Sequence, residues 1–258
     1  MLDEASFTRI EQIGKERFAN PGAFTYFFVG KIDTVSIKPL IEKCLASLPA
    51  AENAEHWVDL GIRKPTGIIE KIVNKGTESK SIQYFLFHGK LNYSTKDIIE
   101  LEALSRILTT RLQESIREDK SSVYYIGAQP GYNKWTVTDY EMTIYYGTSP
   151  EKLNELKESV FATICEMKEK DPTQDEVDKA REKIKREHET NLRENSYWEG
   201  VLKTYYLNKE GDFKTFGEFD RVVEGLNLKY LKFAASRTFN FKNYISVALM
   251  PETTTKAQ

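Results

Sequence analysis

Cysteine and histidine are both scarce in this chain of 258 residues, which contains two cysteines and three histidines. Two cysteines cannot build a disulfide framework. Cys44 and Cys165 each stand among apolar residues at helical spacing, so we expect both to pack as core hydrophobes. The histidines, His56, His88 and His188, are far apart, and neither H-x-x-x-H nor H-x-x-E-H occurs. The sequence therefore predicts no metal site in this chain.

An excess of one charge sign and long apolar runs are also missing. Lysine and arginine number 37 and the acidic residues 39, which gives a formal net charge of -2. Such a balance provides no overall field to attract nucleic acid or anionic lipid. No segment approaches the roughly 18 apolar residues that a membrane span requires, and the first residues lack a signal-peptide pattern. We therefore expect a soluble, packed protein with no nucleic-acid partner and no membrane span.

Two large classes of enzyme lack their motifs here. Neither G-x-x-x-x-G-K-[ST] nor G-x-G-x-x-G occurs, so no glycine loop is available to approach a phosphate. The G-x-S-x-G turn of many serine hydrolases is missing as well. What the chain does have is a regular alternation of helical and strand patterns.

Hydrophobic spacing predicts the secondary structure along the chain. Capping boxes at Ser94 and Thr173 each predict a helix start. A Pro-Gly turn within 129–134 is expected to join two long strands. The expected helices are 6–18, 36–49, 94–117, 149–170, 173–208 and 227–239, and the expected strands are 23–30, 67–74, 81–91, 121–129, 134–148 and 243–252.

The chain begins and ends with the same pattern of a helix, a short polar turn and a strand. A lone strand with two helices cannot form a sheet. We therefore predict that residues 1–52 are the C-terminal part of a preceding homologous α+β domain and that 53–65 are a linker. Residues 66–258 would then form one complete α+β domain, with a mostly antiparallel sheet covered by helices.

One pair of residues combines groups that could act on a peptide. Arg117 ends the helix predicted over 94–117, and Tyr124 follows seven positions later in a strand. The arginine could simply complement the helix dipole, and the tyrosine could be a packed strand aromatic. Together, however, they offer a permanent cation for carbonyl or carboxylate oxygens and a phenol that can donate to a developing oxyanion.

The stretch "LSRILTTRLQESIREDKSSVYYIGAQP" resembles the arginine-and-tyrosine segment in the C-terminal half of pitrilysin and insulin-degrading enzyme type zinc metallopeptidases. "NPGAFTYFFVGKIDTVSIKPLIEKCLASLP" is similar to the strand and helix that close one domain of that family. "TQDEVDKAREKIKREHE" is similar to a helix of the following domain. The order of the three segments extends the resemblance over nearly the entire chain.

The resemblance implies a metallopeptidase LuxS/MPP-like domain in the C-terminal part of a zinc metalloendopeptidase that hydrolyses peptides or unfolded proteins in a closed chamber. Zinc is expected in the missing N-terminal half, so this chain should be inactive alone. Arg117 would hold substrate carbonyls, and Tyr124 would contact the substrate and assist the transition state. Many members carry glycine where this chain has Ser121 and Ser122, which leaves Tyr125 as the backup candidate.

The expected partners are a zinc-bearing N-terminal half or partner subunit and a peptide substrate, and the remnant domain could also support a homodimer. The alternative from another class is a catalytically inactive structural or partner subunit, of the processing-peptidase or respiratory-complex core type. Fold does not separate the two, because function resides in the site. The parent protein could be periplasmic or secreted, and the compartment stays open.

Overall fold

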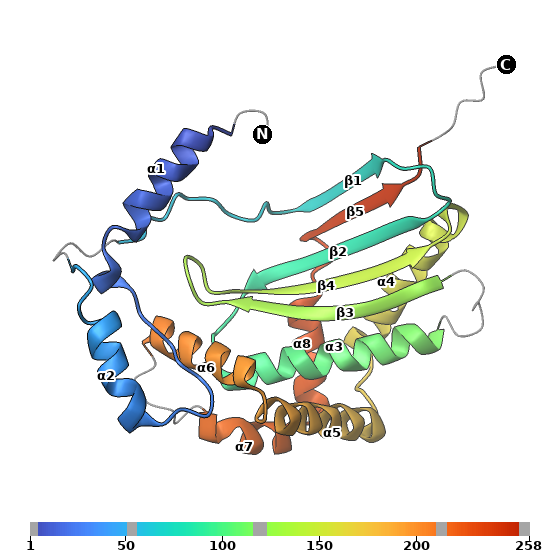
Figure 1. The fold of residues 1–258 in the computed structure, drawn as a ribbon. Coiled ribbons are helices and arrows are strands. Elements are labelled where there is room, and N and C mark those ends of the chain that lie inside the picture. Colours follow the sequence, from blue (N-terminus) through green and yellow to red (C-terminus); the bar gives the residue numbers. More distant parts are fainter. Residues whose placement is uncertain (1–4, 51–55, 116–122, 210–215, 253–258) are drawn as a thin grey trace. The chain divides into compact units, whose positions relative to one another are not determined.

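The computed structural model describes residues 5–50, 56–115, 123–209 and 216–252 (Figure 1). The chain folds into two compact units. One unit contains residues 1–61 and 191–211, and the other contains 62–190 and 212–258. The predicted remnant domain (1–52) and linker (53–65) were defined by homology between domains, and both stay predictions.

The larger unit is an α+β domain built on one five-stranded sheet. The strands are β1 (Ile68–Asn74), β2 (Ser81–Lys90), β3 (Val123–Asn133), β4 (Asp139–Thr148) and β5 (Tyr244–Met250). Their order across the sheet is β1-β5-β2-β4-β3, so the last strand of the chain lies inside the sheet. The β1–β5 pair is parallel, whereas β5–β2, β2–β4 and β4–β3 are antiparallel, as expected for a mostly antiparallel sheet.

Helices cover one face of this sheet (Figure 1). The helices of the unit are α3 (Thr95–Ser115), α4 (Leu153–Glu169), α5 (Gln174–Asn191), α7 (Phe219–Glu224) and α8 (Leu228–Thr238). Their apolar stripes pack against alternate strand residues, because successive side chains of a strand point to opposite faces. The largest fully buried members of this core include Phe85, Phe87, Leu101, Leu108, Met142, Ile144, Tyr146 and Phe239.

The capping box at Thr173 is confirmed, and Ser94 caps its helix as predicted, although the Asp97 carboxylate accepts from the Ser94 hydroxyl. The backbone N–H of Asp97 donates to the Ser94 hydroxyl at 3.1 Å. The backbone N–H of Glu176 donates to the Thr173 hydroxyl at 3.3 Å, and the Glu176 carboxylate accepts the Thr173 N–H at 2.7 Å. Each cap satisfies backbone donors that the first helical turn leaves free.

The smaller unit contains α1 (Phe7–Phe18), α2 (Thr34–Cys44) and α6 (Asn195–Asn208). The strand expected over 23–30 is not formed in the described structure. Aromatic and β-branched residues favour an extended backbone, but a strand also requires a neighbouring strand with which to pair. This unit is therefore helical, and Phe24, Tyr26 and Phe28 remain exposed.

The helix predicted over 173–208 is two helices, α5 and α6, separated by residues 192–194. The Glu194 N–H bonds the Asn191 carbonyl at 2.9 Å, which closes a turn. The carbonyl of Leu192, left free by the break, accepts the indole N–H of Trp198 at 2.9 Å. This side-chain bond compensates for the interrupted helical hydrogen bonding.

The Pro-Gly turn predicted between two strands is also wrong, because β3 continues through Pro130 and Gly131. The chain turns instead over 134–138. The N–H of Ala128 donates to the Thr109 hydroxyl, and that hydroxyl donates to the Ala128 carbonyl. Both backbone groups of Ala128 therefore point away from β4, toward the free edge of the sheet. The backbone groups of every second residue of a strand point the same way, so the nitrogen of Pro130 also lies at the free edge. The N–H that proline lacks is therefore not one that would pair with β4.

Neither cysteine packs in the core as predicted, because both thiols are exposed. On α4, Val160, Ile164 and Met167 form the buried stripe. Cys165 follows Ile164 directly, and adjacent helical residues point in different directions. Cys44 is the last residue of α2, a helix without buried residues in the described structure.

Candidate functional site

Tyr124 lies near the start of β3, at an irregularity in the strand. Val123 is paired with Thr148 and Tyr125 with Gly147, so Tyr124 is an extra residue between two consecutive pairs. Such a bulge redirects the side chains around it. Tyr124 is 55% exposed, which excludes the interpretation that it is a packed core aromatic.

Arg117 lies within residues 116–122, outside the described part of the chain, as do Ser121 and Ser122. The distance between Arg117 and Tyr124 is therefore not part of the structure. A different cation accompanies the tyrosine: the Lys80 ammonium lies 5.9 Å from the centre of the Tyr124 ring. Lys80 directly precedes β2 and also forms an ion pair with Glu78 at 3.0 Å.

The sheet face opposite the helices carries three neighbouring tyrosines, Tyr84, Tyr145 and Tyr125, which we call the tyrosine row. They lie on β2, β4 and β3, which are adjacent in the sheet. Ring centres are 6.3 Å apart between Tyr84 and Tyr145 and 6.2 Å between Tyr145 and Tyr125. Burial, reinforced by the neighbouring phenols, raises the pKa of Tyr125. The Tyr125 phenol is therefore uncharged at neutral pH.

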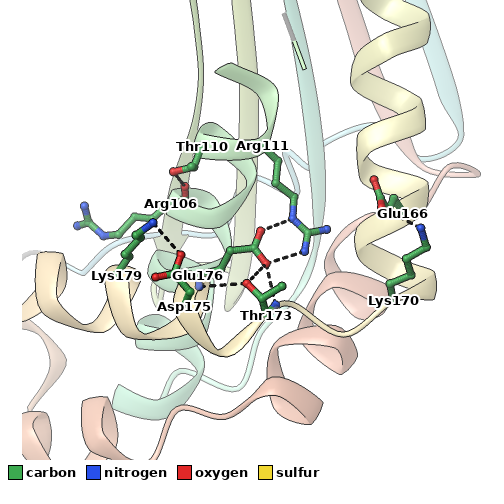
Figure 2. Close-up of polar contacts among 9 residues, drawn as sticks. All are labelled: Arg106, Thr110, Arg111, Glu166, Lys170, Thr173, Asp175, Glu176 and Lys179. Carbon is green, nitrogen blue, oxygen red and sulfur yellow. Dashed lines mark hydrogen bonds and ion pairs between the residues drawn. The ribbon is translucent and has the colours of Figure 1, made fainter. Parts of the chain in front are cut away.

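On the helical side of β3, a groove of about 890 Å³ runs between α3 and α5. Its lining includes Ile126–Ala128 of β3 and Tyr145 of β4. Figure 2 shows polar side chains of the helices beside the groove, including the Arg111–Glu176 pair that joins α3 to α5. Lys179 pairs with Asp175 at 2.7 Å at the exposed rim. The groove thus adjoins the tyrosine row at the edge of the sheet.

Arg111 and Glu176 join the two helices that form this groove. The Arg111 Nε and Nη2 atoms donate to the two carboxylate oxygens of Glu176 at 2.5 and 2.9 Å (Figure 2). The Arg111 bond, helped by Thr173 and opposed by burial, lowers the pKa of Glu176 to about 2. The Glu176 carboxylate is therefore a permanent anion at neutral pH, and its charge is neutralised by the arginine.

A second contact between α3 and α5 involves Arg106. Its two Nη atoms donate to the Glu187 carboxylate at 2.9 and 2.6 Å, and Nη2 also meets Glu102 at 3.5 Å. Burial raises the pKa of Glu102 against the opposing charge of Arg106. Two separate arginine–carboxylate contacts therefore fix the spacing of the helices.

The described residues contain no group of three or more His, Cys, Asp or Glu side chains that could hold a metal ion. His188 instead stacks on Phe219, with ring centres 3.8 Å apart. Its imidazole pKa is lowered by burial. The zinc that the resemblance implies is expected in another half of the protein, and none of the described side chains is assigned to it. No helix in the described ranges is long and apolar enough to cross a bilayer.

Comparison with protein families matches residues 15–184 to the peptidase M16 inactive domain. The chain therefore belongs to the M16 inactive-domain family, which confirms the resemblance to pitrilysin-type zinc peptidases. It is 23% identical to a zinc protease PQQL-like protein of Arabidopsis thaliana, over 91% of this chain and 27% of that protein. It is 26% identical to a probable zinc protease PqqL of Haemophilus influenzae, over 52% of this chain and 14% of that protein.

Solved structures show the same fold. A protease from Helicobacter pylori aligns with a TM-score of 0.72 and 19% identity, over 86% of this chain and 54% of that one. The periplasmic protease PqqL of Escherichia coli aligns with a TM-score of 0.70 and 14% identity, over 86% of this chain and 25% of that one. The chain thus spans about a quarter of the Arabidopsis and Escherichia coli proteins.

Proposed function

We propose that this chain is the substrate-binding part, without zinc, of a zinc metalloendopeptidase that hydrolyses peptides or unfolded proteins in a closed chamber. The observation that supports the proposal is the exposed phenol of Tyr124 at the bulge of β3. At this position the phenol is accessible to a bound peptide. Membership of the inactive-domain family is in line with a zinc-bearing half in the same polypeptide or in a partner subunit.

Tyr124 acts on the substrate through its hydroxyl group. As water adds to a peptide carbonyl, negative charge develops on the carbonyl oxygen, and a phenol O–H directed at that oxygen donates a hydrogen bond to it. A donor fixed in advance by a rigid sheet stabilises this charge without reorganisation. The bulge supplies the direction, because a regular strand position would fix the side chain to one face.

Arg117 is the second proposed contact. It stands two residues beyond the end of α3 and seven before Tyr124. A guanidinium presents several N–H donors that can hold backbone carbonyls of an extended peptide. In this scheme the arginine positions the substrate backbone, and the tyrosine acts on the bond that is hydrolysed.

The proposal is tested by combining the chain with the zinc-bearing half and measuring peptide hydrolysis by Tyr124→Phe. Loss of one donor to a developing oxyanion lowers kcat by roughly 100-fold. Tyr132→Phe is the matched control, because Tyr132 also lies on β3 and is 39% exposed. Arg117→Ala should raise KM, and bound zinc should be unchanged in all three variants.

Turnover by Tyr124→Phe equal to that of Tyr132→Phe would reject the assigned role. The structural or partner subunit would then be the better description of the chain. Loss of zinc or of assembly in Tyr124→Phe would also contradict it, because the phenol is proposed to act on the substrate alone.

A further inference from the structure

We propose that the tyrosine row is a subsite for one large apolar or aromatic side chain of the bound peptide. The inference rests on the proposed function, since it places the peptide backbone beside Tyr124. Tyr125 connects the two places, because it follows Tyr124 directly and its ring lies 6.2 Å from that of Tyr145.

The register of the strands brings the three rings together. Tyr84 is paired directly with Tyr145 across the β2–β4 ladder. Across the β3–β4 ladder, a glycine is paired with each tyrosine: Gly127 of β3 with Tyr145 of β4, and Gly147 of β4 with Tyr125 of β3. The row therefore crosses three adjacent strands of a rigid sheet.

The two glycines give the rings room to lie against the backbone. A Cβ atom at position 147 would be 2.6 Å from Cε1 of Tyr125. A Cβ atom at position 127 would be 3.1 Å from the hydroxyl oxygen of Tyr145. Side chains at these positions would displace the rings, so the glycines allow the row its arrangement before a ligand binds. Such preorganisation reduces the entropy lost on binding.

The chemistry of the row selects the ligand. The neighbouring positions on this face are neutral, namely Ile82, Leu86, Gln129, Thr143 and Val247. An acidic side chain would lose water there, and the Lys80 ammonium beside Tyr124 is already paired with Glu78. Aromatic rings in offset or edge contact are favoured beyond the area they bury. The row therefore suits Phe, Tyr, Trp or Leu, and it disfavours Asp, Glu or Lys.

The size of the row argues for a single side chain of a peptide as its ligand. Tyr84 is 46% exposed, Tyr125 is 43% exposed, and Tyr145 is partly buried. Since one tyrosine side chain presents roughly 200 Å², the row leaves on the order of 250 Å² uncovered. A stable interface needs about 800 Å² from each partner. A second copy of this chain is therefore a poorer match than one bound residue.

Isothermal titration calorimetry on the 258-residue chain tests the inference with three short unstructured peptides, identical except for a central Phe, Ala or Glu. The Phe peptide should bind roughly 3- to 10-fold more tightly than the Ala peptide, the gain expected of aromatic contacts. The Glu peptide should bind most weakly. Tyr125→Ala and Gly147→Ala should each abolish the preference for Phe, the first by removing a ring and the second by displacing it.

Tyr230→Ala is the matched control, because Tyr230 is 48% exposed on α8, away from the row. It should keep the preference, and all variants should give the far-UV circular dichroism spectrum of the folded parent chain. Equal affinity for the Phe and Ala peptides, no measurable binding of either, or an unchanged preference in both row variants would overturn the inference. Dimers that dissociate on Tyr125→Ala would overturn it in favour of a second copy.

Failure of the subsite and failure of the proposed function have different signatures. The subsite is read from binding selectivity of this chain alone, without zinc. The function is read from hydrolysis by the assembled enzyme with Tyr124→Phe. Normal turnover in that variant together with selective binding would reject the role of Tyr124 and leave the row as a peptide-binding surface.

Discussion

Arg111 and Glu176 form a two-point ion pair that connects α3 to the first turn of α5, although they are 65 residues apart in the sequence. The same carboxylate also accepts the N–H and the hydroxyl of Thr173, at 2.7 and 2.9 Å. The side chains of Arg111 and Glu176 are only 14% and 19% exposed. One carboxylate thus caps α5 and joins it to α3 at the same time.

We expect Arg111→Met to lower the free energy of unfolding by about 2 to 3 kcal/mol, because it leaves a largely buried carboxylate without its partner. Urea unfolding at neutral pH measures the change. Lys179→Met is the matched control: its pair with Asp175 is 71% and 70% exposed, so its loss should be within about 0.5 kcal/mol. Equal effects of the two substitutions would contradict the role of the Arg111 pair.

The same pair makes stability depend on pH in the acid range. The folded pKa of Glu176, about 2, is below its ordinary value of 4.5. A group with a depressed folded pKa contributes stability above its unfolded pKa and loses it as pH falls through the folded value. We therefore expect stability from this group to decline between about pH 4.5 and pH 2. Urea titrations across that range should show a shallower decline in Arg111→Met than in the parent chain, and parallel curves would argue against the linkage.

The starts of two helices were the most predictable part of the fold. Ser94 and Thr173 define their helices by bonds within three or four residues, and such local chemistry is visible in a sequence. The aromatic and β-branched residues at 24–29 are an equally clear sequence signal for a strand, but no strand forms there in the described structure. Strand formation depends on a partner from elsewhere in the chain, which a local pattern does not contain.

The candidate site shows the same limit. The spacing of Arg117 and Tyr124 is a local signal, and it identified a tyrosine that is exposed at the surface. The bulge beside it depends on the register between β3 and β4, which sequence reasoning did not provide. The Arg111–Glu176 pair was missed for a related reason: the capping box identified Glu176, but its partner comes from another helix.

The last prediction concerns the segment that leads into β1. The Lys64 ammonium forms ion pairs with Asp139 and with Glu141, the latter at 2.6 Å. Burial pushes the pKa of Lys64 downward, but hydrogen bonds and charges from the two carboxylates outweigh burial and raise it. Lys64 therefore stays charged at neutral pH. Three residues later, the N–H of Gly67 donates to the side-chain oxygen of Asn243 at 2.9 Å.

We expect Lys64→Met to free this segment locally without unfolding the domain. Exchange of the Gly67 N–H, measured by NMR, should accelerate about tenfold, because the anchoring charge next to it is gone. Lys80→Met is the control, since its pair with Glu78 is 59% and 79% exposed and should anchor nothing. The pKa of Lys64 is raised above 10.5, the ordinary value for lysine. As pH rises beyond about 10.5, Lys64 should lose its charge, and the parent chain should approach the behaviour of Lys64→Met. Gly67 exchange that is the same in the parent chain and in Lys64→Met at neutral pH would show that Asn243 holds the segment without help from the ion pairs.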